Sequence, residues 1–343
     1  VQGVNMMGNV AVHNLLHLVN GNFNIGPHDL TINGALQQDA GWLISDPGSG
    51  LIIGGTAPAF HSELTQLRKL ELNRPQGIQF HNNLQIFDCV NLINGAFNLN
   101  GFALSYEPGC TLRYLGLAPQ TTSNGEFPAI SGPENVEAMN FFGVSLHDSR
   151  TIEGNLSIIS GNFLIGTNTL TLSGNLFSPF FGGGLTGSTE SNLVIGEGST
   201  PGDPFLLNSI VLNNLMLNRA AGLVLNGDLD THGTVHLENG TLDLRFNKFT
   251  IRNPLSGNQD NLHATPESTI ELSGSSPEMN VGPEDNIRIS IVGSLIISNL
   301  HEDGIKLNAI LEIMNQFSVR SNSIFVVSPG RHLTVHDGVL ITP

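Results

Sequence analysis

The fold is decided by one short stretch, Gly161-Asn162-Phe163-Leu164-Ile165-Gly166-Thr167-Asn168-Thr169-Leu170-Thr171-Leu172. Phe163 and Ile165 are apolar at alternate positions, and so are Leu170 and Leu172. This period of two is typical of β-strands and not of helices. The Gly and Asn residues between the two pairs tolerate the backbone of a tight corner. The stretch therefore predicts two short strands joined by a turn.

The same pattern returns along the whole chain. Clear copies begin at Gly21, Gly95 and Gly240, and a degenerate copy begins at Asn315. Successive copies are about 75 residues apart, which is the kind of spacing that repeat architectures show. The sequence therefore predicts five degenerate repeats.

A second marker gives the same alignment. The segment 67–74 matches the segment 212–219, and both end in Asn-Arg. Their offset equals the offset between Gly95 and Gly240. Since two independent markers agree, we treat the repeat as real.

The composition excludes several classes of protein. Gly accounts for 40 of 343 residues, charged residues for 12% and hydrophobic residues for 39%, which is unlike a helical or a disordered chain. The net charge of −16 leaves no basic patch for nucleic acid and disfavours an anionic membrane. The sequence has no apolar run of 18 or more residues, so no transmembrane helix is predicted. The region around Val1 lacks the features of a signal peptide, so we expect a removed signal or a piece of a longer protein.

Strand-sized pieces punctuated by Asn-Gly and Ser-Gly fill the chain, and no segment predicts a helix. A β-sandwich array would need longer strands and separate closed cores. The short strands and the continuous pattern favour a solenoid instead. We predict an all-β parallel β-helix of about 14 coils, forming a single elongated domain over 1–343. Its predicted repeat units are 8–58, 64–117, 136–195, 205–272 and 287–343.

The alternation also predicts a core and an outside. Buried positions are expected at Phe163, Ile165, Leu170, Leu172, Leu225, Val235, Leu242 and Leu244. Asn residues at inward corners are expected to form hydrogen-bonded ladders. The variable segments 118–135, 177–191, 253–268 and 274–286 are expected to bulge outward, with Phe127, Phe180 and Phe181 exposed. Exposed strand edges at both ends suggest further repeats or packing of copies in a fibre.

In composition and spacing, segments 161–174 and 214–229 resemble the solenoid repeats of very large surface proteins of Bacteroidota. Those proteins are exported by the type IX route and act as adhesins, gliding-motility proteins or surface fibres. The resemblance covers nearly the whole chain and rests on composition and spacing. It implies a secreted, extracellular protein at the cell surface. No type IX sorting domain is recognisable, which is expected of a fragment or a processed chain.

Several motifs raise the question of a metal site. The His-x-x-x-His spacing occurs at His13/His17, His232/His236 and His332/His336, a spacing that brings both rings to one ion only across a corner. The alternative is a polar ladder on the outside of the coils. Asp228, Asp230, Glu238 and Asp243 offer oxygen ligands for Ca²⁺, but no calcium-binding loop motif surrounds them. We predict no metal site and no cofactor, with Ca²⁺ as the alternative.

The two cysteines, Cys89 and Cys110, are separated by about one coil and match no zinc motif. Stacking of coils would bring them close together, and the sequence leaves open whether they pair.

A polysaccharide-active β-helix enzyme is the rival class, because such enzymes also use this fold. It needs clustered acids, whereas Glu71, Asp88, Glu107, Asp228 and Asp243 are scattered. Arg74 and Arg219 are equivalent in the repeat, which suggests that they cap carbonyl groups at a corner. No nucleophile elbow or phosphate loop occurs, and Thr169/Thr171 alone does not make an ice-binding face. We predict no catalytic residue.

The sequence therefore predicts a structural or display segment of a secreted adhesin or fibre that attaches to cells or surfaces. Expected partners are copies of the same chain and cell-surface or glycan ligands, without nucleic acid or membrane insertion. The alternative function is a polysaccharide-active enzyme or a carbohydrate-binding module.

Overall fold

The computed structural model describes residues 3–178, 183–197, 203–277 and 279–342. In these residues every strand pairing is parallel, and the fold is a parallel β-solenoid of about 16 turns. The predicted fold class is confirmed. The turns outnumber the predicted 14 because a coil takes close to twenty residues, as in the step from Leu51 to Leu70.

Helices play almost no part in the described chain. They are limited to one 3₁₀ turn, η1 (Gln259–Asn261). None of the helical structure among the described residues is long enough to span a bilayer.

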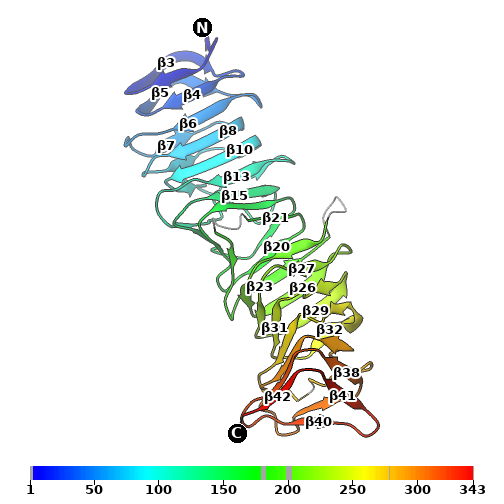
Figure 1. Cartoon of the computed structure of the whole chain (residues 1–343). Coiled ribbons are helices and arrows are strands. Elements are labelled where there is room, and N and C mark those ends of the chain that lie inside the picture. The colour runs from blue at the N-terminus through cyan, green and yellow to red at the C-terminus, as the bar shows by residue number, and fades with distance from the viewer. Residues whose placement is uncertain (1–2, 179–182, 198–202, 278, 343) are drawn as a thin grey trace. The chain divides into compact units, whose positions relative to one another are not determined.

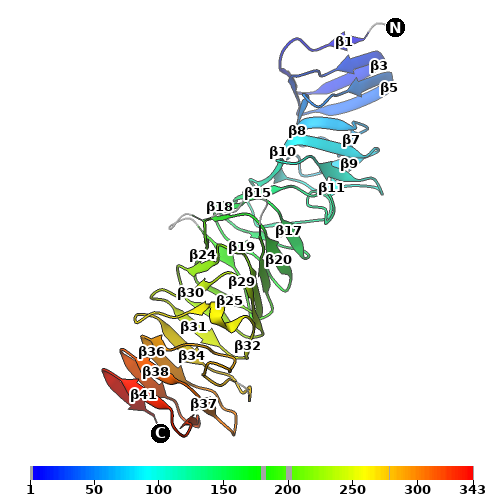
Figure 2. The ribbon, with the colours of Figure 1, turned by 90° about the vertical axis from the view of Figure 1, so that its right-hand side faces the viewer.

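The chain divides into two compact units, and each is a stack of coils. Unit 1 holds residues 1–164 and 177–184, and unit 2 holds residues 165–176 and 185–343. Within each unit the strands of successive coils lie side by side (Figures 1 and 2). The single domain and the five repeat units that the sequence predicts stay predictions.

The main sheet of unit 1 takes one strand from each successive coil. Its strands are β2 (Val10–Val12), β4 (Asp29–Ile32), β6 (Gly50–Ile53), β8 (Gln66–Asn73), β10 (Leu84–Asn94), β13 (Thr111–Tyr114), β15 (Asn135–Met139) and β18 (Leu156–Ser160), with β12 (Leu104–Tyr106) beside β10. Smaller sheets contain β1 (Val4–Asn5), β3 (Leu15–Asn24) and β5 (Ala35–Ile44); β7 (Phe60–Ser62), β9 (Ile78–Phe80) and β11 (Phe97–Asn98); and β14 (Gln120–Thr121), β16 (Val144–Ser145) and β19 (Phe163–Leu164). The main sheet continues after β18 with β21 (Leu176–Phe177). Two further strands are β17 (Arg150–Ile152) and β22 (Leu185–Thr186).

Unit 2 has the same construction, with several sheets that run along the stack. One sheet contains β20 (Thr169–Leu172), β23 (Asn192–Ile195), β26 (Asn214–Asn218), β29 (Val235–Asn239) and β32 (Leu255–Gly257). A second contains β24 (Phe205–Leu207), β27 (Leu223–Leu225), β30 (Leu242–Asp243) and β33 (Leu262–His263). A third contains β25 (Ile210–Leu212), β28 (Leu229–Thr231), β31 (Lys248–Ile251), β34 (Thr269–Leu272), β36 (Ser294–Ile297), β39 (Gln316–Val319) and β42 (Gly338–Ile341). The last coils add β35 (Ile291–Val292), β38 (Ile310–Ile313) and β41 (His332–Val335), and β37 (Ile305–Leu307) with β40 (Phe325–Val327).

The core is a set of apolar columns, because parallel pairing in register places like residues above one another. In unit 1, Leu30, Leu51, Leu70, Val90 and Leu112 follow each other as pairing partners on five successive coils. All five are fully buried, and burying each such side chain contributes about 1.5–3 kcal/mol. The eight core residues that the alternation predicts are also buried, so the predicted register is confirmed.

The coils turn at corners that need glycine. Gly95 has φ of 103°, and a Cβ atom there would lie 2.1 Å from the carbonyl oxygen of Arg74 on the preceding coil. No other residue fits such a close approach of two backbones. The Asn-Gly anchor of the repeat therefore reflects the stacking distance between coils.

The prediction for the segment 118–135 is wrong in one respect. Phe127 is buried, with 1% of its surface exposed, and lies under the guanidinium group of Arg150. The segment is drawn inward because the Glu126 carboxylate accepts hydrogen bonds from the Ser123 backbone and from the Tyr114 hydroxyl. Phe180 and Phe181 lie outside the described residues.

Asn side chains form hydrogen bonds at the corners of the coils, and the sequence predicts these bonds only in part. An Asn–Asn contact joins Asn214 to Asn192 on the neighbouring coil. Asn140 and Asn247 instead donate to backbone carbonyl groups of the preceding coil. These amides therefore cap the ends of strands as well as forming ladders.

Candidate functional site

Arg74 is a buried cation that fastens three coils of unit 1 together. It follows β8, and 1% of its surface is exposed. Its Nε donates to the carbonyl of Gly54 at 2.9 Å and its Nη1 to that of Pro58 at 3.0 Å. Its Nη2 donates to the carbonyls of Ile32 at 3.0 Å and Gly34 at 2.7 Å. The predicted capping role is confirmed, and burial lowers the pKa of this guanidinium.

Arg219 does the same in unit 2. Its Nη1 donates to the carbonyls of Ser173 and Gly174, two coils back along the stack. Its Nη2 reaches the side chain of Asn175 and the carbonyl of Asp203. Both arginines therefore have a structural role, and the candidate surface site lies beside the corner of Arg74.

A groove lies beside the Arg74 corner of unit 1. It has a volume of about 390 Å³ and is formed by residues from three successive coils. Its lining residues are Asn73, Leu92, Ile93, Asn94, Gly95, Leu117, Ala118, Pro119, Gln120 and Thr121. None of these side chains is charged, although the chain as a whole carries −16.

Two amide side chains lie next to each other in this groove. Asn73 ends β8, Asn94 ends β10, and the two are pairing partners across neighbouring coils. Both are exposed, and within the described part of the chain neither side chain makes a hydrogen bond. The same holds for the exposed hydroxyl of Thr121. The groove thus offers donors and acceptors that are free to bind a polar ligand.

The far wall of the groove, residues 117–121, is fixed by amide groups behind it. Gln120 Nε2 donates to the carbonyl of Leu92, and Gln120 Oε1 accepts from the backbone of Gly116. Asn140 is fully buried and donates to the carbonyl of Ala118 at 2.7 Å and to Gln120 Oε1 at 2.9 Å. Because the wall is held from both neighbouring coils, the groove is pre-formed.

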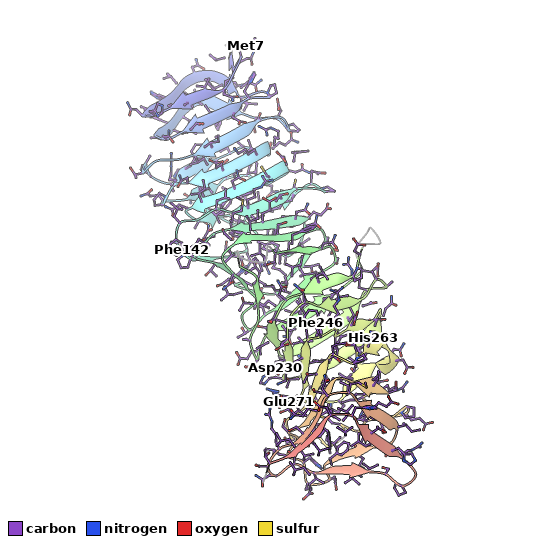
Figure 3. The ribbon with its side chains drawn as sticks, viewed as in Figure 1. Met7, Phe142, Asp230, Phe246, His263 and Glu271 are labelled. Carbon is purple, nitrogen blue, oxygen red and sulfur yellow. The ribbon has the colours of Figure 1, made fainter. Side chains whose placement is uncertain are left out.

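An apolar edge borders the wall, and we use this name for Leu117, Phe141 and Phe142. Leu117 is 86% exposed, Phe141 79% and Phe142 56%. The two rings meet edge to face, with centroids 5.8 Å apart. They occupy the corner of the coil that follows the wall, and Figure 3 shows Phe142 on the outside of the ribbon. Such a patch of exposed apolar side chains commonly marks an interaction site.

In the first two histidine pairs the two members contact different partners. His13 contacts Asn33, whereas His17 pairs with Asp39 at 2.7 Å. His232 lies 3.6 Å from Asp230, and His236 bonds to Ser256. In the third pair, His336 lies 3.9 Å from Glu312. Among the described residues, no three His, Cys, Asp or Glu side chains are grouped to hold a metal ion.

Three of the four carboxylates considered for Ca²⁺ lie on strands of different sheets of unit 2, and Asp228 lies just before β28. Asp230 lies on β28, Glu238 on β29 and Asp243 on β30. Asp230 pairs with Arg252 at 3.0 Å, and Asp243 lies 3.2 Å from His263. Asp228 accepts from the backbone of Lys248. Asp230, His263 and Glu271, a buried carboxylate of the same unit, are labelled in Figure 3.

The acids considered for catalysis are likewise engaged in local contacts. Glu71 pairs with Lys69 at 3.2 Å, and Asp88 lies 3.6 Å from Arg68. Glu107 accepts a hydrogen bond from Gln85. The contacts of Asp88 and Glu107 join neighbouring coils, whereas Glu71 and Lys69 lie on the same strand, β8.

The two cysteines lie on neighbouring coils but remain free thiols. Cys89 pairs in register with Thr111, so Cys110 is one position out of register. The Cys110 thiol donates to the carbonyl of Ile86 at 3.2 Å, whereas the Cys89 thiol contacts the Asp88 carboxylate at 3.8 Å. Burial raises the pKa of the Cys110 thiol to about 11.

Sequence reasoning missed the groove, although one of its signals was present. Asn73 and Asn94 both belong to the repeat anchors, Asn-Arg and Asn-Gly. Their pairing across coils depends on the coil length, and the wall depends on an insertion without a repeat pattern.

The fold and this site define an all-parallel β-solenoid with an uncharged surface groove. A comparison with known protein families, characterised proteins and solved structures finds no match for the chain.

Proposed function

We propose that this chain is a structural and display segment of a secreted cell-surface adhesin or fibre. The observation that carries the proposal is the lock formed by Arg74 and its counterpart Arg219. Each ties a coil to the coils before it through buried hydrogen bonds. Hydrogen bonds to a charged donor are stronger than neutral ones. Together with the apolar columns they make each unit a stiff stack that can hold a binding surface in place.

The mechanical part of the proposal is tested by stretching the chain between its two ends with optical tweezers. We expect stepwise unfolding in blocks of one or a few coils, at forces well above those that extend an unfolded chain. Extension without such steps would contradict a structural segment. The force at which the block around Arg74 opens should fall in an Arg74→Met variant.

The enzyme alternative is tested separately by incubating the chain with neutral and acidic polysaccharides and measuring new reducing ends. A display segment releases none above a heat-denatured control. Release that depends on Glu71, Asp88 or Glu107 would replace the proposal with a polysaccharide-active enzyme.

Association of copies is a further element of the proposal. With −16 on each chain, close packing of copies requires screening of the charge by salt. Sedimentation at low and high salt should therefore show larger species only at high salt. A single species of unchanged size over this range would contradict the fibre and leave the display segment.

A further inference from the structure

We infer that the groove beside Arg74 binds an uncharged oligosaccharide. This inference rests on the proposed function, because it names the ligand that the displayed surface takes. It is carried by the unpartnered amides of Asn73 and Asn94, the lack of charge in the lining and the apolar edge of Leu117, Phe141 and Phe142.

A side-chain amide offers two donors and an acceptor, which matches neighbouring hydroxyl groups that both donate and accept. Two such amides on adjacent coils are spaced by the coil repeat of about 4.8 Å, a distance similar to the length of one sugar residue. Asn73, Asn94 and Thr121 can therefore contact consecutive sugars of a chain that runs along the stack.

All lining residues of the groove are neutral, while the rest of a chain with net charge −16 repels anions. An anionic ligand would lose its hydration without gaining a partner of opposite charge, and a cation would find no carboxylate in the lining. A ligand with many hydroxyl groups and no charge avoids both costs.

The C–H groups on the face of a sugar ring carry partial positive charge and pack against the negative face of an aromatic ring. Phe141 and Phe142 present their rings to solvent at the end of the wall. Binding sites of this composition, apolar with a few placed polar groups, are typical of small-ligand recognition.

Gln120 and the buried Asn140 hold the wall through four hydrogen bonds to the backbone and to each other. A pre-formed wall reduces the entropy that binding would otherwise cost. These two side chains are positioning residues, since their own hydrogen bonds are already made within the protein.

The repeat supplies a matched control inside the same molecule. Asn218 and Asn239 of unit 2 are pairing partners at the positions that correspond to Asn73 and Asn94. The coil after Asn239 continues into η1, where Asp260 pairs with Arg288 at 3.1 Å. That corner therefore has the two amides but charged neighbours.

The test measures binding of hexasaccharides of glucose, mannose and N-acetylglucosamine to the full chain by isothermal titration calorimetry. Hexagalacturonate serves as the anionic probe. We expect at least one neutral hexasaccharide to bind. Asn73→Leu/Asn94→Leu should weaken it about tenfold, which corresponds to two hydrogen bonds, and Phe142→Ala about threefold or more. Asn239→Leu and Asn20→Leu, at the same repeat position, should bind as the unchanged chain does.

Folding of each variant is checked by circular dichroism, and Asn94→Asp provides a second, nearly isosteric groove variant. No binding of any neutral hexasaccharide overturns the inference. Tighter binding of hexagalacturonate overturns the assigned chemistry, and binding that survives the groove variants overturns the assigned site. Each of these results leaves the stretching experiment unaffected, so failure of the groove and failure of the structural function can be told apart.

Discussion

The corner at Arg74 in unit 1 and the corner at Arg219 in unit 2 are equivalent positions of the repeat, but the two arginines differ in their hydrogen bonds. Both arginines are almost fully buried, and both reach a carbonyl 16 residues earlier in the chain. Arg74 uses Nε, Nη1 and Nη2 to bind four carbonyl groups. In Arg219 the Nε is buried without a hydrogen-bond partner among the described residues.

The two corners share the hydrogen bonds of a buried arginine and differ in the surface beside it. A buried guanidinium needs acceptors, because an unpaired charge in the interior is costly. Both copies therefore keep the lock between coils. The surface beside the lock has no such requirement. Unit 1 places an uncharged wall and an aromatic pair there, whereas unit 2 places η1 and the ion pair of Asp260.

The largest expected effect comes from removing the lock. Arg74→Met keeps much of the apolar stem but leaves four carbonyls without this donor, at about 1–3 kcal/mol each when no other donor replaces it. We expect a loss of more than about 4 kcal/mol in the free energy of unfolding. Arg219→Met should cost about 1–3 kcal/mol less, because one of its donors is already unpaired.

Urea denaturation, followed by hydrogen exchange of peptides from each unit, measures both losses. Arg331→Met, at an exposed arginine, controls for the loss of a positive charge and should change stability little. Equal losses for Arg74→Met and Arg219→Met would show that the unpaired Nε of Arg219 is of no consequence.

A smaller effect is expected from the cores of the two copies. Leu244 is fully buried, whereas its repeat counterpart Leu99 is partly exposed. Leu244→Ala should cost roughly 2–5 kcal/mol, because a cavity remains in a closed column. Leu99→Ala should cost less than half of that, since water already reaches the site. The same denaturation experiment measures both, and a larger loss for Leu99→Ala would refute the register of the repeat.

Much of the fold could be predicted because the signals are local. The period of two at Phe163 and Leu170 and the Asn-Gly anchors specify strands and corners, and the matched Asn-Arg pairs specify equivalent positions. The capping role of Arg74 followed from that equivalence. The predicted number of coils was too low, because residues of irregular segments cannot be assigned to coils without knowing which of them pair.

The groove could not be predicted from the sequence, for a physical reason. It depends on which residues become neighbours across coils, as Asn73 and Asn94 do. The inward position of Phe127 depends on Glu126 and Arg150, which come from separate coils. A segment rich in Gly, Pro and Ser gives no periodic signal for such contacts.

The smallest expected effect concerns two buried glutamates, one in each unit, whose pKa values shift in opposite directions. Burial raises the pKa of Glu126, and hydrogen bonds from Ser123 and Tyr114 only partly offset this. Burial also acts to raise the pKa of Glu271, but its bonds to Lys248 and Ser298 and the charge of Arg320 outweigh burial and lower it. The folded state of unit 1 thus favours a protonated Glu126, and that of unit 2 favours an ionised Glu271.

The signs of the pH dependence follow from these shifts. The contribution of Glu126 is fully present below the ordinary glutamate pKa of 4.5 and is lost as the pH rises through its higher folded value. The contribution of Glu271 is present above 4.5 and is lost as the pH falls through its lower folded value. Unfolding free energies of Glu126→Gln and Glu271→Gln, measured relative to the unchanged chain between roughly pH 3 and pH 7, should therefore change with opposite slopes. Glu126→Gln should gain relative stability as the pH rises and Glu271→Gln should lose it. Slopes of the same sign would show that the ion pairs of Glu271 do not overcome the cost of its burial.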